Sequence, residues 1–485
     1  MTAELNQRNA DNVGKGHPKG LWNLSLTELW ERFSYYGLQG TLTYYLLFSI
    51  ADGGLGLVPA TAVGIVGAYG ACVYLAQIPG AWLADRLLSP RSMILAGGTI
   101  IMLGHIALAL IPSITGLVAG LALISVGTGA LKTSITTIVG LLYDDRPVED
   151  RDAGFTYFYM SISLGAVTGM LCVGFTQSRL GFHVAFGLAA IGMAAALIQY
   201  IAAMRTLPPA AGIVKNPVGR KQLGYLAICV ALVCAMLASG VASGLIRGSN
   251  VNLLAGFVII VVFVGCIGRI LSSDHVTPAE KRRTRGFVPM WIAGSVFVGL
   301  SGQVFTTVPL LVTERVDLNI GGWQMPESWL AVIGSIALIV VSPLSATALR
   351  TSWLGRTNTA TKYSLGIGVT AMAYFMLTAT DLWPGRTVPA WFVAACLIIT
   401  GFAEVLVGPI GLALATRVAP RRFQSQLVAL QILTLGAGAT IYGTLGALYT
   451  AMSTGQFFFL TGVLGVIAAV VLAAFSKPIE DLLQS

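Results

Sequence analysis

Charged residues are scarce in this sequence. Asp, Glu, Lys and Arg make up 10% of its 485 residues, whereas hydrophobic residues make up 55% and the mean hydropathy is +0.80. A typical soluble domain is about a quarter charged. So few charges cannot cover the surface of the two or three soluble domains that this length would otherwise indicate. The sequence therefore predicts an all-α polytopic membrane protein, with the lipid bilayer as its solvent.

Motifs for metals, disulfides and hydrolytic chemistry are also missing. The six cysteines fall inside apolar runs with no CxxC and no Cys/His ligand spacing, which predicts buried free thiols and no metal site. There is no GxSxG and no HExxH, so we expect neither an intramembrane enzyme nor a cofactor. The first twenty residues lack an apolar core, which argues against a cleaved signal peptide.

Long apolar runs are abundant instead. A helical span needs about 20 mostly apolar residues. Fourteen stretches meet this requirement: 25–50, 58–84, 92–111, 114–143, 154–177, 182–204, 222–246, 251–271, 287–313, 328–349, 362–380, 388–416, 424–450 and 455–475. An even number of spans predicts that both termini lie on the same side of the membrane.

The distribution of Lys and Arg predicts which side that is. If the N-terminus is cytoplasmic, 23 of the 29 Lys and Arg residues fall on cytoplasmic segments, four fall on the opposite side, and Arg32 and Lys132 lie inside spans. Cations are enriched on cytoplasmic loops. We therefore expect both termini in the cytoplasm. The net charge of +9 then reflects topology, and a nucleic-acid partner is not expected.

Polar stretches divide the chain into five parts. They predict a cytoplasmic tail (1–20), a six-helix bundle (21–206), a linker with two extra transmembrane helices (207–285), a second six-helix bundle (286–476) and a short cytoplasmic tail (477–485). A weak repeat supports two related halves, because Leu83–Arg86 followed by Arg91 is similar to Ala348–Arg350 followed by Arg356. Such halves resemble the major facilitator fold. We expect a monomer, with the extra helices packed against lipid.

The clear instances of charged residues inside the predicted spans are Glu28, Glu31, Arg32, Lys132 and Glu404. In the first span, Glu28, Glu31, Arg32, Tyr35 and Gln39 follow one another at helical spacing, with Tyr36 beside them. Charges in the hydrocarbon region are costly unless they pair or face water. This stripe therefore predicts a water-filled cavity beside the first helix.

These charges predict a binding site for a zwitterion. Lys132 can neutralise one of the two glutamates of the first span and Arg32 the other, whereas Glu404 has no basic partner in its own helix. A short peptide could direct its carboxylate to Lys132 or Arg32 and its amino group to Glu404. A glutamate released from Lys132 would take up a proton, which would link substrate binding to proton binding. The alternative is a static network of ion pairs that holds helices together.

Several motifs resemble those of the proton-dependent oligopeptide transporters. Glu28–Gly37 matches the signature ExxERFxYYG of that family. Gly80–Arg86 is similar to its GGWLADR segment, Phe158–Ala166 to its FYMxINxGA segment, and Glu404–Pro409 to its EFLxxP segment. The resemblance covers nearly the whole chain and is stronger in the first half. The extra helix pair is typical of bacterial members, which implies the inner (plasma) membrane of a bacterium.

The resemblance also implies roles for individual residues. Glu28, Glu31 and Arg32 correspond to the proton-coupling cluster, and Lys132 to its ion-pair partner. Tyr35, Tyr36 and Tyr74 correspond to tyrosines that contact peptide, and Glu404 to the acid that receives the peptide amino group. Further candidate substrate contacts, with Lys132, are Gln39, Tyr159, Ser163, Gln303 and Gln431.

The chain departs from the family pattern at several of these positions. Gln39 replaces an arginine, Ser163 an asparagine, Gly302 an acid that helps to close the outer gate, and Gln431 a tryptophan. These changes predict a wider pocket.

The function implied is a proton-coupled symporter that imports di- and tripeptides or peptide-like compounds by alternating access. The alternatives are a transporter of the same fold for a specialised non-peptide or modified-peptide solute, and a peptide-binding receptor that has lost transport.

Overall fold

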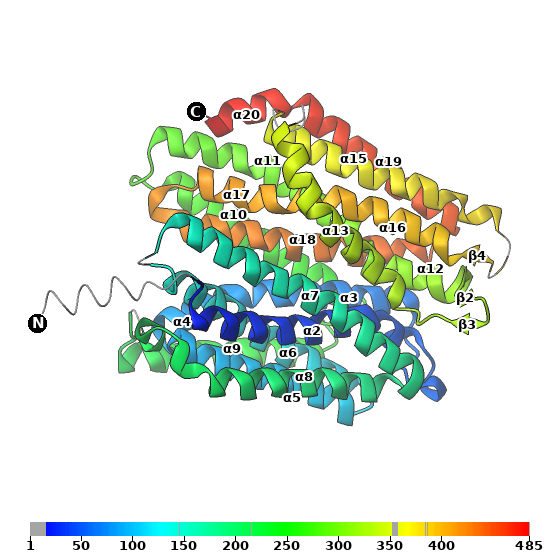
Figure 1. Cartoon of the computed structure of the whole chain (residues 1–485), viewed down its shortest axis with the longest axis horizontal. Helices are drawn as coiled ribbons and strands as arrows, with labels where there is room; N and C mark the ends of the chain where they lie inside the picture. The colour runs from blue at the N-terminus through cyan, green and yellow to red at the C-terminus, as the bar shows by residue number, and fades with distance from the viewer. Residues whose placement is uncertain are drawn as a thin grey trace, which may run out of the picture.

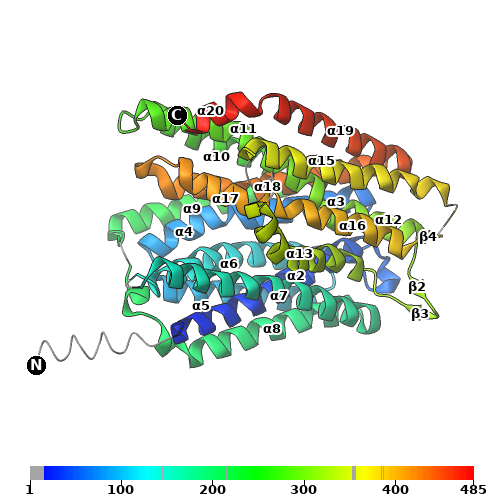
Figure 2. The same ribbon diagram turned by 45° about the horizontal axis from the view of Figure 1, so that its top comes forward.

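Long helices lying side by side dominate the computed structural model, which describes residues 16–144, 146–214, 216–351, 357–383, 385 and 387–484 (Figures 1 and 2). Residues 1–15 of the predicted tail, Lys215, Arg356 and Arg386 lie outside the described residues. The described chain begins and ends at the left of Figure 1, which we call the tail end. The short strands lie at the opposite end, which we call the strand end.

The first half of the chain contains the helices α2 to α8. Their bounds are α2 (Lys19–Leu47), α3 (Pro59–Leu75), α4 (Gln77–Arg86), α5 (Pro90–Leu110), α6 (Ile114–Leu141), α7 (Val148–Leu180) and α8 (Phe182–Ala202), with the 3-10 helices η1 (Ile50–Asp52), η2 (Met204–Thr206) and η3 (Pro209–Gly212). Two helices follow, α9 (Arg220–Ala242) and α10 (Val251–Ser272).

The second half contains the remaining elements. The helices are α11 (Pro278–Ser301), α12 (Thr307–Arg315), α13 (Trp329–Thr351), α15 (Thr359–Thr378), α16 (Ala390–Val405), α17 (Gly408–Val418), α18 (Gln424–Tyr449), α19 (Thr454–Ala474) and α20 (Ser476–Gln484). The 3-10 helices are η4 (Gly302–Phe305), η5 (Ala379–Leu382) and η6 (Arg421–Phe423). The strands β1 (Val316–Asp317) and β4 (Val388–Pro389) pair in parallel, and β2 (Asn319–Ile320) and β3 (Trp323–Gln324) form an antiparallel hairpin.

Helix lengths and hydropathy agree with a polytopic membrane protein. Among the described residues, twelve helical stretches are long and apolar enough to cross a bilayer. Two further long helices coincide with predicted spans: α2 has 29 residues and contains the charges Glu28, Glu31 and Arg32, and α13 has 23 residues. Every predicted span overlaps at least one helix, although several of these helices are interrupted near their middle.

The two halves meet mainly where α3 packs along α18 (Figures 1 and 2). Small residues allow this close approach, because a Cβ atom added at Gly67 would lie 2.7 Å from the Cα atom of Gly443. Optimal carbon–carbon contacts are about 3.5–4.0 Å. The glycines therefore bring the two helix backbones closer than larger residues would allow.

Hydrogen bonds join the halves towards the strand end. The Thr43 hydroxyl donates to the Phe305 carbonyl at 2.5 Å, and the Tyr44 hydroxyl donates to the Glu327 carbonyl at 3.1 Å. The Trp329 indole N–H donates to the Leu171 carbonyl at 3.0 Å. These bonds connect α2 and α7 of the first half to elements of the second half. They link the two halves at this end.

The two extra helices differ in their surroundings. α9 is exposed along most of its described length, as expected for a helix packed against lipid. α10 instead packs against α3, α11 and α18, and so contacts both halves. The Asn252 side-chain amide of α10 donates to the Thr440 carbonyl at 2.9 Å and to the Thr444 hydroxyl at 3.0 Å. The expectation that both helices only face lipid is therefore wrong for α10.

The expectation of buried thiols is also wrong in part. Cys396 is buried, but Cys72, Cys172 and Cys229 are free and exposed on helix surfaces. An apolar run in a soluble protein indicates burial, whereas in a membrane protein the outer helix face is itself in an apolar solvent. The sequence pattern therefore could not separate these two environments.

Candidate functional site

A cavity of about 500 Å³ lies between the two halves near the middle of the helices. Its lining comes from α2, α3 and α7 of the first half and from α11, η4, α13, α15, α16, α17 and α18 of the second half. This volume falls within the range of about 300–1,000 Å³ that is typical of small-molecule sites. The cavity is therefore large enough for a small solute, and both halves contribute to its wall.

Interrupted helices shape the second-half wall of the cavity. α16 ends at Val405 and α17 begins at Gly408, followed by Pro409, so the single span predicted here is two helices. A proline lacks the backbone N–H that would continue the helical bonding. A second break lies after α11, which ends at Ser301; the chain then continues as the 3-10 helix η4 and the helix α12. At breaks of this kind, backbone N–H and C=O groups lose their helical hydrogen-bond partners and become available beside a cavity at membrane depth.

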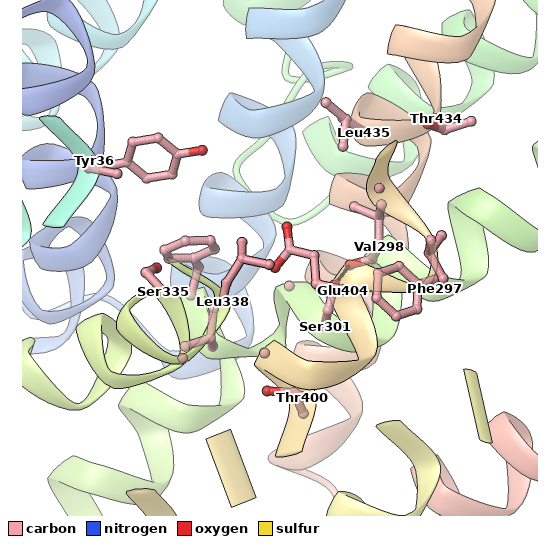
Figure 3. Close-up of a pocket in the computed structure, with 18 of the residues that line it drawn as sticks. Tyr36, Phe297, Val298, Ser301, Ser335, Leu338, Thr400, Glu404, Thr434 and Leu435 are labelled. Carbon is pink, nitrogen blue, oxygen red and sulfur yellow. Dashed lines mark hydrogen bonds between the residues drawn. The ribbon is translucent and has the colours of Figure 1, made fainter. Parts of the chain in front are cut away.

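Glu404 and Tyr36 approach the cavity from opposite halves (Figure 3). Glu404 lies in the last turn of α16, where its side chain is exposed to the cavity. Tyr36 on α2 points its hydroxyl towards the same space. Among the described lining residues, Glu404 is the only charged one. The second-half wall therefore offers a site for a cation, surrounded by apolar groups and hydroxyls.

The charged residues of α2 form ion pairs beside the cavity. Arg32 makes a bidentate pair with Glu31, with N–O distances of 2.5 and 2.7 Å. Lys132 on α6 pairs with Glu28, whose Oε1 is also 3.5 Å from Nε of Arg32. The two glutamates are fully buried and Arg32 is 6% exposed. We refer to these four residues as the charged cluster; it has the pairing that the sequence analysis predicted.

The second carboxylate oxygen of Glu28 makes no hydrogen bond within the described part of the chain. Thr128 contributes a long hydroxyl contact of 3.5 Å to Glu31. Unpaired buried carboxylate oxygens are costly. The cluster is therefore held together by its two cations and by few other donors, which makes it sensitive to the loss of either cation.

Two tyrosines connect the charged cluster to the cavity. The guanidinium of Arg32 lies 4.7 Å from the ring centre of Tyr35 and 5.8 Å from that of Tyr36. The two rings pack edge to face with their centres 5.1 Å apart. Both tyrosines line the cavity. A cation above an aromatic face is attracted to it, so a solute that moves these rings also changes the surroundings of Arg32.

Seven of the candidate substrate contacts line the cavity: Tyr35, Tyr36, Gln39, Tyr74, Ser163, Glu404 and Gln431. Lys132, Tyr159 and Gln303 do not. Lys132 is engaged by Glu28, and Tyr159 is 50% exposed on α7 outside the cavity lining. Gln303 is fully buried, and its side-chain oxygen Oε1 accepts from the Thr306 and Thr307 hydroxyls at 3.1 and 2.8 Å. These bonds hold Gln303 inside η4 and away from the solute space.

The cavity also contains residues that sequence reasoning missed. They include Phe297, Ser301, Tyr363, Thr400 and Tyr442. Hydroxyl and aromatic residues are common in membrane helices, so nothing in their sequence spacing marked them. Tyr442 packs on Gly302, and its ring occupies the space beside this glycine. The expectation of a pocket wider than in the family stays a prediction. Among the described residues, no group of His, Cys, Asp or Glu could hold a metal ion.

A family model and curated relatives match this chain over most of its length. The model of the POT family matches residues 91–460. A di-/tripeptide transporter of Lactococcus lactis subsp. cremoris is 32% identical over 96% of this chain and 97% of its own length. An uncharacterised transporter of Bacillus subtilis, YclF, is 31% identical over 96% of this chain and 95% of its own length.

Solved structures agree in fold. A POT peptide transporter crystallised with alafosfalin has a TM-score of 0.91 and is 31% identical over 97% of both chains. A POT family transporter crystallised with 5-aminolevulinic acid has a TM-score of 0.89 and is 30% identical over 96% of this chain and 97% of the other. The charged stripe on α2, the cavity between two helical halves and these matches agree with one another, and the chain belongs to the POT family of transporters.

Proposed function

We propose that this protein is a proton-coupled symporter that imports di- and tripeptides or peptide-like compounds. The observation that carries the proposal is the asymmetry of the cavity. Glu404 on the second half offers a carboxylate, and the tyrosines of α2 on the first half lead to Arg32 and the charged cluster. A zwitterionic peptide can match both ends, with its amino group at Glu404 and its carboxylate towards Arg32.

The relatives support this substrate class. The Lactococcus lactis relative is a di-/tripeptide transporter, and related POT structures contain alafosfalin, 5-aminolevulinic acid or a thioalcohol-conjugated peptide. The second candidate, a specialised peptide-like solute, is favoured by Gln39 and Gln431, whose neutral amides line the cavity. Direct competition between dipeptides and larger analogues distinguishes the two candidates.

Proton coupling would arise from exchange of partners in the charged cluster. Glu28 is fully buried, and its ion-pair partner is Lys132. A substrate carboxylate that attracts Arg32 or Lys132 weakens the pairing with Glu28 or Glu31, and a buried carboxylate that loses its cation favours the protonated form. Substrate and proton binding then stabilise one another, which is the condition for symport.

The structure corresponds in this proposal to a state closed on the outside. We infer that α2 and α13 join the twelve candidate spans to give fourteen, with both termini in the cytoplasm of a bacterium. The tail end then faces the cytoplasm, which agrees with the placement of Lys and Arg in the sequence. The strand end, where Thr43 and Tyr44 bond to the second half, is the closed outer side. Alternating access requires these contacts to open and the tail end to close.

Uptake into liposomes tests the proposal. Purified protein is reconstituted, and accumulation of labelled dialanine is measured with and without an inward proton gradient. We expect accumulation that an uncoupler abolishes. Equal uptake with and without the proton gradient would contradict coupling of transport to protons. Absence of dialanine uptake, together with uptake of a larger peptide-like compound, would favour the specialised substrate, and high-affinity binding without any flux would favour a receptor.

A further inference from the structure

A single side chain supplies the charge of the described cavity wall. Glu404 is the only charged residue among the described lining residues, and it takes part in none of the ion pairs in the described part of the chain. Its side chain extends from α16 into the space between the halves, with Val298 and Leu338 beside it (Figure 3). A carboxylate among apolar groups is costly unless it is paired. Glu404 therefore favours a solute that brings a positive charge.

The cations of the first half do not offset this charge. Arg32 is 6% exposed and is absent from the described lining. The rings of Tyr35 and Tyr36, which do line the cavity, lie over its guanidinium at 4.7 and 5.8 Å. The charged cluster as a whole has two acids and two cations, so its own charges cancel. The cavity and the cluster together therefore carry one negative charge when their acids are ionised.

The first-half wall of the cavity offers a neutral acceptor. Gln39 lines the cavity and is 2% exposed, and its Oε1 has no hydrogen-bond partner among the described residues. An amide oxygen only accepts hydrogen bonds. The carboxylate of a solute has no hydrogen to donate to it, whereas a carboxamide has two. Gln39 therefore matches a solute whose second end is an uncharged N–H donor.

The other titratable groups that line the described cavity are phenols. They are Tyr35, Tyr36, Tyr74, Tyr363 and Tyr442. A phenol ordinarily ionises at about pH 10 and is uncharged at neutral pH. The charged residues of α15 and α17, which pack against α16, are Lys362 and Arg417, and neither lines the cavity. The described side chains of α13 and β4, which also pack against α16, are uncharged.

The helices around the charged cluster add no further charge beside it. Lys132 is the only charged residue of α6, and α3 and α8 contain no Asp, Glu, Lys or Arg. The charged residues of α7, which packs along α2, lie near the two ends of that helix. A change in the charge of the solute is therefore balanced within the cavity and the cluster themselves.

We propose that the cavity fits a monocation without an added proton: a solute with an amino group for Glu404 and an uncharged second end, such as a peptide amide. The charges of the solute and the site then cancel. A zwitterionic dipeptide brings no net charge, so its carboxylate has to displace a glutamate from Arg32 or Lys132, and the displaced glutamate binds a proton from water. A dipeptide therefore binds with one more proton than its amide. This inference rests on the proposed function and names the charge class of its solutes.

The test is equilibrium binding of matched compounds to the purified protein. Dialanine is compared with dialanine amide, and 5-aminolevulinic acid with its methyl ester, by isothermal titration calorimetry. The range is about pH 5.5 to 7, where the amino groups are largely protonated and the carboxyls ionised. A difference of one bound proton changes the ratio of two dissociation constants by about tenfold per pH unit. We expect the dissociation constant of the zwitterion to rise by this factor relative to that of the monocation, and the monocation to bind more tightly at neutral pH.

The bound protons are counted by repeating the calorimetry in two buffers with different enthalpies of ionisation. We expect one more proton with dialanine than with its amide. This count uses the parent protein alone and does not depend on the folding of any variant.

Three variants locate the effect. Glu404→Gln removes the charge that the monocation neutralises, so the amide should lose more affinity than dialanine and its advantage at neutral pH should disappear. Glu404→Asp keeps the charge and should keep the preference. Glu314→Gln is the matched control, because this acid on α12 accepts from the Tyr449 hydroxyl at 3.3 Å and does not line the cavity. We expect the control to prefer the amide as the parent protein does.

Three results would overturn the inference. The first is binding of the zwitterion as tightly as the monocation at neutral pH in each pair that binds. The second is a pH-independent ratio with equal proton counts. The third is an equal loss of the preference in Glu404→Gln and Glu314→Gln, which would indicate a general effect of charge. Binding of the 5-aminolevulinic ester without binding of either dipeptide form would contradict the proposed peptide substrate but support the charge class, and binding of none of the four compounds would contradict both.

Discussion

Replacement of Lys132 by methionine tests the role of the charged cluster. The methionine keeps most of the length of the side chain and removes only its charge. Glu28 then retains Arg32 at 3.5 Å as its nearest cation, but Arg32 is already engaged by both oxygens of Glu31. Glu28 is fully buried, and its Oε2 has no hydrogen bond among the described residues. The variant therefore leaves a buried carboxylate without a full partner.

Breaking a buried ion pair from one side costs about 3–5 kcal/mol. The cost arises because the remaining charge stays buried without a full partner. Without Lys132, a substrate carboxylate no longer has this cation to compete for, so substrate binding can no longer be linked to proton binding at Glu28. We therefore expect loss of gradient-driven accumulation of dialanine, whereas exchange of labelled for unlabelled dialanine across the same liposomes should persist.

The assay compares both modes in one preparation. Lys132→Arg, which keeps the charge, is the control and should retain some gradient-driven accumulation. Normal accumulation by Lys132→Met would refute the coupling argument. Loss of both accumulation and exchange in a folded variant would also refute it, because this result would indicate that the ion pairs only hold α2 and α6 together.

Three other substitutions test separate parts of the structure. Glu404→Gln should weaken binding of free dipeptides at least about tenfold more than binding of their N-acetylated forms, because a charge-assisted hydrogen bond contributes about 1.5–3 kcal/mol. Equal losses for both forms in a competition assay would contradict the role of Glu404 as the acceptor of the peptide amino group. Gly80→Ala should lower the thermal unfolding temperature, because the added Cβ would overlap the carbonyl of Gly129. Such overpacking costs about 1–3 kcal/mol. An unchanged unfolding temperature would contradict the close packing of α4 on α6. Asn252→Leu removes the bonds of α10 to α18 and should reduce the rate of exchange, and a rate equal to that of the parent would show that α10 is dispensable.

Much of the fold follows from the length and spacing of apolar runs. The predicted span 92–111 corresponds to α5 (Pro90–Leu110), and 424–450 corresponds to α18 (Gln424–Tyr449). The breaks in the helices were not predicted. Hydropathy continues through Gly408 and Pro409, so the apolar run did not indicate that two helices meet there.

The charged part of the site was predictable because charges in a membrane helix are rare and must pair. Glu28, Arg32 and Lys132 can be identified in this way from the sequence alone. The neutral part was not predictable. Gly302 was recognised only as a missing acid, and the residue that fills its space, Tyr442, lies 140 positions later on another helix. Conversely, Gln303 was expected to contact substrate but lies in η4, where the hydroxyls of two threonines bond to its side chain.

The central claim is that peptide entry carries protons through the charged cluster. The most direct test is to trap a pH-sensitive dye inside liposomes that contain the protein, and then to add dialanine outside without any imposed gradient. We predict acidification of the interior with the parent protein and none with Lys132→Met. Entry of dialanine without acidification in the parent, or equal acidification in both proteins, would contradict the account.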